Sequence, residues 1–243
     1  MSARYWDNGN FSQPEISQLK QNTRNTVAKE RKKGKQPEPV IIEGRKIVNS
    51  WWGQKWCDNL EQYADFENRI ARGKRYVRAG TVIDLKIEKG RVSARVQGSR
   101  KAPYKVEIRI SPLSEEKCQS VIARCTRKIE SLEELLKGNF PQELKELFTD
   151  SDSGLFPAPK EISFMCSCPD WAIMCKHVAA VLYGIGARFD SSPLMFFELR
   201  GIDPEKFIDI AIKDRIEKMI DNSQCKSPRI IDFENGNDIF GVF

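Results

Sequence analysis

The clearest pattern of hydrophobic and polar positions is a strict alternation between residues 80 and 111. Apolar and polar residues alternate along three short segments, 83–88, 91–97 and 105–110, and Lys89-Gly90 forms a turn pair between the first two. A period of two over three neighbouring segments predicts an antiparallel β meander with one buried face and one face in water.

Elsewhere the hydrophobic residues recur at helical spacing. Trp52, Trp56 and Leu60 form a stripe that predicts a helix over residues 50–64, with Ser50 able to cap its start. Further helices are expected within 112–148, over the apolar run 178–184, over 192–201, and from Asp203-Pro204 to about residue 220.

These patterns divide the chain into five stretches. The first is polar and basic with prolines near its end, so we expect a disordered tail there. The predicted boundaries are 1–45 for this tail, 46–150 for a basic α+β domain, 160–190 for a small metal-binding module, 191–221 for C-terminal helices packing on that module, and 222–243 for a flexible tail.

The charge is distributed unevenly. Residues 1–110 contain 24 Lys/Arg against 12 Asp/Glu, whereas the remainder contains 16 against 22, within a net charge of +6. A basic half suggests a polyanionic partner, although a merely solvated face remains the alternative. The predicted nucleic-acid contacts are Arg72, Lys74, Arg75, Arg78, Lys86, Arg91, Arg95, Arg100, Lys101 and Arg109.

The candidate chemistry is concentrated in a short cysteine and histidine motif. Cys166 and Cys168 are followed after six residues by Cys175 and His177, and His177 is the only histidine of the chain. Three thiolates and one imidazole complete a tetrahedral Zn²⁺ site and leave no position for a reactive water. The motif therefore predicts one structural zinc ion rather than a catalytic one.

Two other interpretations of the motif remain. One is a disulfide, but the cysteine count of seven is odd and the N-terminal residues do not read as a secretion signal. The other is a Cys–His nucleophile pair, which would need an orienting third group and an exposed thiolate. Two further cysteines beside the pair favour metal over both.

The motif resembles the SWIM zinc finger, a module of Swi/Snf-type ATPases and plant Mu-like transposases. The resemblance is carried by the spacing Cys166-x-Cys168-x6-Cys175-x-His177 and by Pro169, Asp170 and Trp171 within the six-residue gap. The resemblance extends over about residues 49–200 to bacterial SWIM zinc finger family proteins. It is carried there by Ser50-Trp51-Trp52-Gly53, the segment 73–80, Gln97-Gly98-Ser99-Arg100 and Pro103-Tyr104. It implies a small ββα-like zinc module and, as a partner, a Swi/Snf-type helicase, because such proteins are often encoded beside one.

Together these observations predict an α+β fold, with an antiparallel meander and flanking helices followed by the zinc module on C-terminal helices. No phosphate-binding loop or paired catalytic acids are found, so we expect no enzyme, and no apolar run reaches the ~18 residues of a membrane span. We expect a bacterial cytoplasmic protein, compatible with nucleoid association, that binds nucleic acid, DNA in preference to RNA, and no small-molecule substrate.

A second hypothesis from the sequence is a pure protein-interaction module without nucleic-acid contact. Its surface would be built from Trp171, Ile173, Met174 and the helix that follows them. A third hypothesis is a fragment of transposase ancestry, suggested by the occurrence of the finger in Mu-like elements. The absence of a spaced acidic triad argues against transposase activity.

Overall fold

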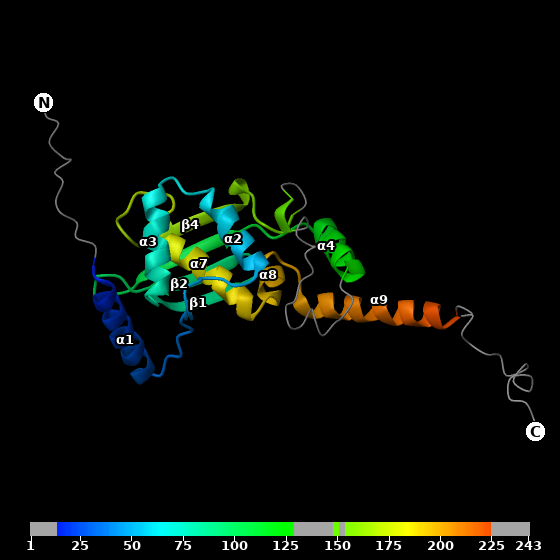
Figure 1. Cartoon of the computed structure of the whole chain (residues 1–243), viewed down its shortest axis with the longest axis horizontal. Helices are drawn as coiled ribbons and strands as arrows, with labels where there is room; N and C mark the ends of the chain where they lie inside the picture. Colours follow the sequence, from blue (N-terminus) through cyan, green and yellow to red (C-terminus); the bar gives the residue numbers. More distant parts are fainter. Residues whose placement is uncertain (1–13, 129–147, 151–153, 225–243) are drawn as a thin grey trace, which may run out of the picture.

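The computed structural model describes residues 14–128, 148–150 and 154–224, and within them helices cover one face of an antiparallel sheet (Figure 1). The four strands lie in the order β1 (Val82–Glu88), β2 (Arg91–Val96), β3 (Tyr104–Ile110) and β4 (Ile162–Cys166). The predicted α+β fold with an antiparallel meander is confirmed.

The alternation of residue types sets the two faces of the sheet. On the inner face Val92 pairs with Ile108, and both are fully buried. On the outer face Arg91 pairs with Arg109, and both are exposed. Gly90 makes the turn between β1 and β2 with φ at +68°, a left-handed conformation that favours glycine.

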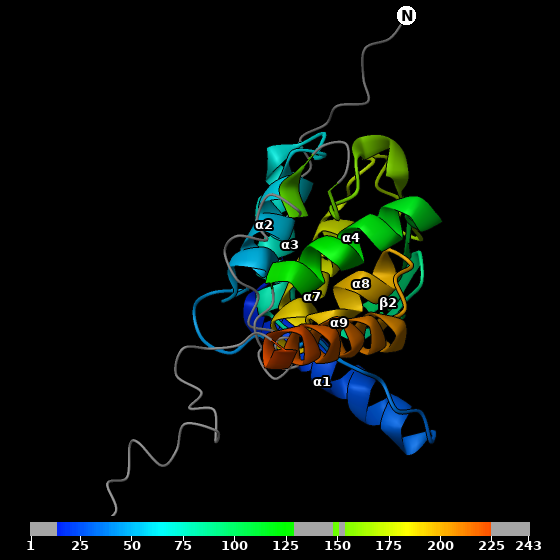
Figure 2. The same cartoon turned by 90° about the vertical axis from the view of Figure 1, so that its right-hand side faces the viewer.

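Helix α7 (Lys176–Ser191) is the centre of the core. It crosses the inner face and contacts all four strands, and every residue from His177 to Gly186 is buried. Helices α2 (Trp51–Glu61) and α3 (Glu67–Arg78) pack against α7, so the molecule has a helical layer on a sheet, as the side view shows (Figure 2). A helix that is apolar on every side suits this position.

Polar contacts fix α2 against α7. Ser50 caps α2 by accepting a hydrogen bond from the backbone N–H of Gly53, and Ser50 itself donates to Asp190 at the end of α7. The buried indole of Trp56 donates to the carbonyl of Leu182 at 3.0 Å. The predicted helix over residues 50–64 is thus confirmed as a core element.

The N-terminal region differs from the disordered tail predicted for residues 1–45. Residues 16–32 form helix α1 (Ile16–Lys32), in which Leu19 is fully buried and Thr26 donates to Gln97 at 2.9 Å. After α1, the backbone N–H of Val40 donates to Val82, which extends the chain along the edge of β1. The hydrophobic pattern that would indicate this helix in the sequence is weak, because α1 is mostly polar and is held by tertiary contacts.

Three helices of the described part of the chain lie at the other end of the sheet. Helix α4 (Glu115–Lys128) follows β3, and α8 (Leu194–Leu199) and α9 (Pro204–Gln224) follow α7. The sequence predicts that both C-terminal helices pack on the zinc module. Helix α8 does contact α7, but α9 packs mainly on α4 and α8 and extends away from the sheet (Figure 1).

The zinc module is not a separate ββα unit. Its strand β4, preceded by the short 3-10 helix η2 (Pro159–Glu161), pairs with β3 and is the fourth strand of the meander. Its helix α7 shares one continuous core with α2, α3 and the sheet. The tail up to residue 13, the helical continuation over 129–147 and the tail from 225 lie outside the described residues. Among the described helices, none is both long and apolar enough to cross a bilayer.

Candidate metal centre and the basic cleft beside it

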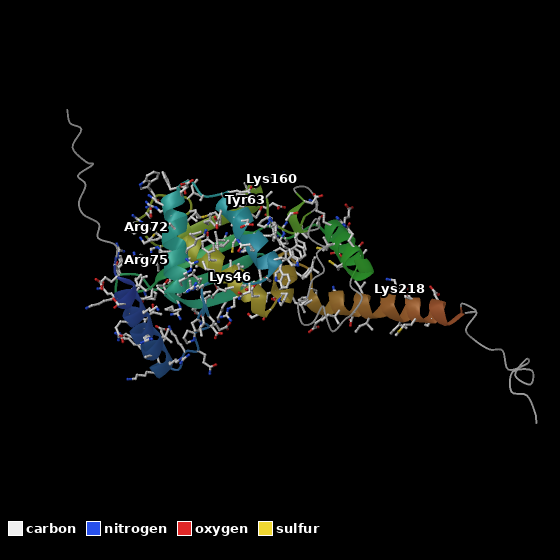
Figure 3. All side chains as sticks on the ribbon, in the orientation of Figure 1. Lys46, Tyr63, Arg72, Arg75, Lys160 and Lys218 are labelled. Atoms are coloured by element: carbon white, nitrogen blue, oxygen red, sulfur yellow. The ribbon has the colours of Figure 1, made fainter. Side chains whose placement is uncertain are left out.

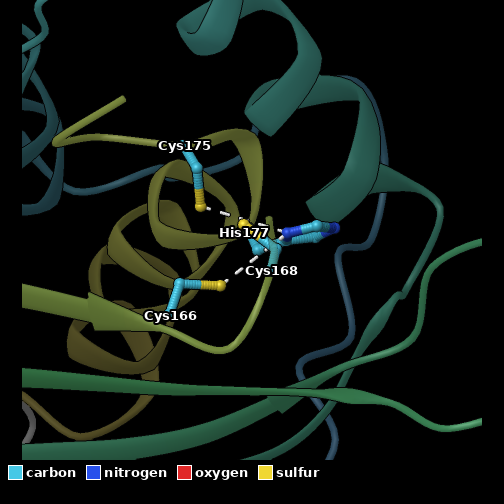
Figure 4. Close-up of side chains that lie close together, drawn as sticks. All are labelled: Cys166, Cys168, Cys175 and His177. Atoms are coloured by element: carbon cyan, nitrogen blue, oxygen red, sulfur yellow. Dashed lines mark hydrogen bonds between the residues drawn. The ribbon is translucent and has the colours of Figure 1, made fainter. Parts of the chain in front are cut away.

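Cys166, Cys168, Cys175 and His177 meet at one point between the end of β4 and the start of α7 (Figure 4). Their four ligand atoms all lie within 4.8 Å of one another. The Nδ1 atom of His177 is 3.9 Å from the sulfur of Cys166 and 4.0 Å from that of Cys175.

These separations fit a zinc ion. Tetrahedral zinc, with Zn–S of about 2.3 Å and Zn–N of about 2.0 Å, holds sulfur and nitrogen about 3.6 Å apart. The distances from His177 Nδ1 to the sulfurs of Cys166 and Cys175 exceed this value by a few tenths of an ångström. Three sulfurs with one imidazole nitrogen are a common structural donor set. The cluster therefore supports one structural zinc ion with a closed coordination shell.

The local sequence explains how the ligands converge. Cys166 ends β4, and Ser167 keeps the strand pairing by donating its N–H to the carbonyl of Lys105 and accepting the N–H of Lys105 on its hydroxyl. Pro169 then turns the chain away, and Cys175 returns as the N-cap of α7. The N-terminus of a helix favours negative charge, so a thiolate is stabilised at Cys175.

The electrostatics of the thiols agree with this position. The pKa of Cys175 is lowered to about 4, first by the hydrogen bond from the Cys166 thiol, then by the one with His177, and burial only partly opposes this. The same hydrogen bond raises the pKa of Cys166, and burial raises the pKa of Cys168. A bound zinc ion would stabilise all three cysteines as thiolates.

His177 is held by aromatic rings. Its ring stacks on Tyr104 with centroids 4.2 Å apart, and the edge of Tyr76 approaches it from α3. Gly98 permits this stack, because a Cβ there would lie 2.8 Å from the Tyr104 ring. With Nδ1 directed at the cysteines, the buried Nε2 atom has no hydrogen-bond partner among the described residues.

The loop between the second and third cysteines is held from α3. Asp65 accepts hydrogen bonds from the backbone N–H groups of Ile173 and Met174, at 2.9 and 3.3 Å. The guanidinium of Arg69 forms a two-point contact with the carboxylate of Asp170, both at 3.1 Å. Side chains just before and along α3 therefore fix the zinc loop on the protein.

A cleft of about 620 Å³ opens beside the zinc ligands. Cys168 and His177 form one wall, α3 forms another, and the start of α1 and the loop after β2 complete it. Its basic lining residues are Arg69, Arg72, Arg75, Arg100 and Lys176, and Asp170 is the acidic one. Figure 3 shows Arg72 and Arg75 on the outer side of α3. We call this hollow the basic cleft.

The ten basic residues singled out from the sequence do not form one surface. Arg72, Arg75 and Arg100 line the basic cleft. Arg75 donates to the carbonyl of Pro14, and the Arg100 guanidinium lies 5.6 Å from the centre of the Tyr104 ring. The part-buried Lys74 instead forms an ion pair with Glu61 at 2.7 Å.

Four of the ten belong to the outer face of the sheet: Lys86, Arg91, Arg95 and Arg109. Glu107 lies between Arg91 and Arg109 and pairs with both, at 2.8 and 2.6 Å. Arg95 pairs with Glu30 of α1 and with Asp84. Much of the positive charge on this face is therefore neutralised within the protein. Arg78 and Lys101 are exposed and do not line the basic cleft.

Two residues of the basic cleft were missed from the sequence, Arg69 and Lys176. Arg69, Arg72 and Arg75 recur every three residues, which places them on one side of α3. This spacing is visible in the sequence once residues 67–78 are taken as a helix. The protein-interaction surface predicted from the sequence is smaller in the structure. Met174 and most of α7 are buried, so only Trp171 and Ile173 of that predicted surface are exposed.

Residues 166–184 match the family model described as the SWIM zinc finger, a binding module that indicates no catalytic family. Among curated proteins, the chain is similar to the "Uncharacterized protein Rv2102" of Mycobacterium tuberculosis (strain ATCC 25618 / H37Rv). The two are 34% identical over 163 residues, which cover 67% of this chain and 58% of the relative. The chain thus aligns with a little over half of that protein. No solved structure gives a significant match.

Proposed function

We propose that this chain, in which residues 166–184 form a SWIM zinc finger, is a non-catalytic nucleic-acid-binding adaptor that works with a Swi/Snf-type helicase. Zinc holds the loop 168–175 against α3, and this arrangement shapes the basic cleft. The cleft then binds the phosphate backbone, DNA in preference to RNA, in the bacterial cytoplasm.

The observation that carries the proposal is the convergence of cations at the zinc site. Arg72 comes from α3, Arg100 from the loop after β2, and Lys176 from the first turn of α7. Three distant segments thus bring positive charge to one hollow, while the charges on the sheet face are largely paired. Phosphate contacts dominate the affinity of such surfaces and weaken steeply with salt.

The test compares salt dependence between two variants of equal charge. Arg72→Gln/Arg100→Gln removes two cations from the basic cleft, and Lys206→Gln/Lys213→Gln removes two exposed cations from α9 as a matched control. Binding of labelled oligonucleotides is measured from 50 to 300 mM salt.

We expect the cleft variant to lower the slope of log K against log salt by about 1.4 to 1.8, since each lost phosphate contact removes about 0.7 to 0.9. The control should keep the slope of the unmodified protein. Equal slopes for both variants, or no binding of any nucleic acid by the unmodified protein, would contradict the proposal.

The adaptor role needs a second surface, and α9 supplies a candidate. Ile212, Ile216 and Met219 follow one another at four and three residues, and all three are exposed. Residues at this spacing share one side of a helix, as in helices that dock into an apolar groove of a partner. Helix α9 extends from the end of the sheet opposite to α3 (Figure 1), so nucleic acid in the basic cleft leaves α9 free for a helicase.

The adaptor role is tested with the purified Swi/Snf-type helicase of the same organism in nuclease-treated samples. Ile212→Glu/Ile216→Glu should abolish co-purification, while Lys213→Glu on the same helix should not. Partner binding that disappears on nuclease treatment would indicate bridging by nucleic acid. Nuclease-resistant partner binding without any nucleic-acid affinity would favour the alternative, a pure protein-interaction module.

A further inference from the structure

An exposed aromatic pair lies next to the basic cleft. Trp171 is 74% exposed and Phe66 is 39% exposed, and their rings meet edge to face with centroids 5.3 Å apart. Trp171 directly follows Asp170, and Phe66 is the N-cap of the helix that carries Arg69. Arg69 and Asp170 line the cleft and pair with each other, so the aromatic pair adjoins the cleft at that end.

The aromatic pair is held in place before any ligand binds. Trp171 belongs to the loop that joins the zinc ligands Cys168 and Cys175, and both loop ends are therefore fixed by the metal centre. Asp65 and Arg69 anchor the loop from the α3 side. A large ring on an anchored loop loses little conformational freedom on binding, which favours its use in recognition.

The two tyrosine rings that line the cleft, Tyr104 and Tyr76, are already engaged. Tyr104 is only 8% exposed and stacks on His177, and Tyr76 is buried beneath Lys176. Of the rings that the structure describes around the cleft, Trp171 and Phe66 are therefore those with an accessible face. His177 adds a polar group to the lining, because its buried Nε2 atom has no partner among the described side chains.

We infer that the basic cleft and the aromatic pair together bind a single-stranded nucleic acid rather than a duplex. Phosphates lie along Arg72, Arg100 and Lys176, and an unpaired base stacks on Trp171. A positively charged groove with aromatic rings that stack successive bases is the usual solution for single strands, whereas a duplex keeps its base faces hidden. This inference rests on the nucleic-acid binding proposed above and specifies its ligand.

The experiment measures fluorescence anisotropy with four labelled probes of equal length: oligo-dT, oligo-rU, an abasic strand and a duplex. Trp171→Ala is compared with Ile173→Ala, which removes an equally exposed side chain (71%) of the same loop. Zinc content and thermal stability are measured for each variant, so that a loss of folding is separated from a loss of contact.

We expect the single strands to bind more tightly than the duplex. Trp171→Ala should weaken oligo-dT binding by about fivefold to 150-fold, which corresponds to 1–3 kcal/mol per stacked base. It should leave abasic-strand affinity and the salt slope unchanged, and Trp171→Phe should restore part of the loss. The comparison of oligo-dT with oligo-rU, which differ in the sugar and in the 5-methyl group of the base, gives the preference between DNA and RNA.

Three results would overturn the inference. The first is a duplex that binds as tightly as the single strands, and the second is a Trp171→Ala variant that loses equal affinity for the normal and abasic strands. The third is a Trp171→Ala variant that binds oligo-dT as before but no longer co-purifies with the helicase. The last would make the aromatic pair a protein contact. In each case the Arg72→Gln/Arg100→Gln variant would still lose affinity, so the proposed function would stand. Failure of that variant to lose affinity would instead refute the proposed function itself.

Discussion

The contact between α3 and α7 gives a prediction with a definite sign, at Gly73. A Cβ at this position would lie 2.5 Å from the Cβ of Ala179 and 3.1 Å from two backbone atoms of α7. The closest comfortable carbon–carbon contact is about 3.5 Å, so the two helices would have to separate by about 1 Å. The obstacle is a methyl group and helical backbone, neither of which can rotate away.

Two effects compete in Gly73→Ala. Helix propensity alone favours alanine by about 1 kcal/mol, because glycine is the more costly residue within a helix. Overpacking of a well-filled core costs typically 1–3 kcal/mol, and the short distance to backbone places this site toward the upper end. We expect the free energy of unfolding to fall by about 1–2 kcal/mol.

The assay is urea unfolding of the zinc-loaded protein, followed by circular dichroism. A matched double variant, Gly73→Ala/Ala179→Gly, removes the opposing methyl group and should recover part of the loss, so the two changes are coupled favourably. A Gly73→Ala variant as stable as the unmodified protein, or more stable, would refute the close packing of α3 on α7. The basic cleft would lose its support at the same time, because α3 carries Arg72 and Arg75.

Three further predictions follow from other contacts. Cys168→Ser or His177→Ala should reduce bound zinc below half an equivalent, measured by metal analysis. Each should also destabilise the whole sheet and not only residues 160–190, because β4 pairs with β3 and α7 is the core helix. A meander that stays fully protected in amide hydrogen exchange would contradict this prediction. The pKa of Glu30 is lowered from 4.5 by its hydrogen bonds to Arg95 and then Lys35. The support that Glu30 gives to α1 is therefore present above pH 4.5 and is lost as the pH falls through the lower pKa of the folded state. Glu30→Gln should remove this support at neutral pH and speed amide exchange over residues 16–32, whereas Glu43→Gln, at an exposed acid outside α1, should not. Arg200→Ala should lower the free energy of unfolding, measured by urea titration, by about 3 kcal/mol. The reason is that the buried guanidinium donates to the Ser111 carbonyl at 2.6 Å and pairs with Glu161. A loss below about 1 kcal/mol would show that these contacts contribute little to stability.

The sequence by itself determined the elements whose signal is local. The meander follows from alternating residues over 83–110, since a period of two can place one set of side chains on a single face. The zinc ligands follow from Cys166, Cys168, Cys175 and His177, because the donor atoms and their spacing are contained within twelve residues. Helix α2 follows in the same way from its tryptophan stripe.

Only the tertiary structure decided how these elements combine. From the sequence, residues 1–45 are predicted to be a disordered tail, because they carry few apolar residues. The structure forms helix α1 there through contacts with distant segments, such as the hydrogen bond between Glu30 and Arg95, 65 positions away. It also grouped ten basic residues into one surface. The fold neutralises those on the sheet face, and it brings others into a cleft beside the zinc ligands.

That cleft illustrates the physical reason. Arg69 and Asp170 stand 101 positions apart, and Asp65 is 108 positions from the backbone N–H of Ile173 that it binds. Periodicity and motif spacing report only on neighbours along the chain. Contacts between distant segments depend on how α3 and α7 pack, and that is set by the close approach at Gly73 and by the shared core. The metal ligands could therefore be predicted from the sequence, whereas the charged and aromatic surface around them could not.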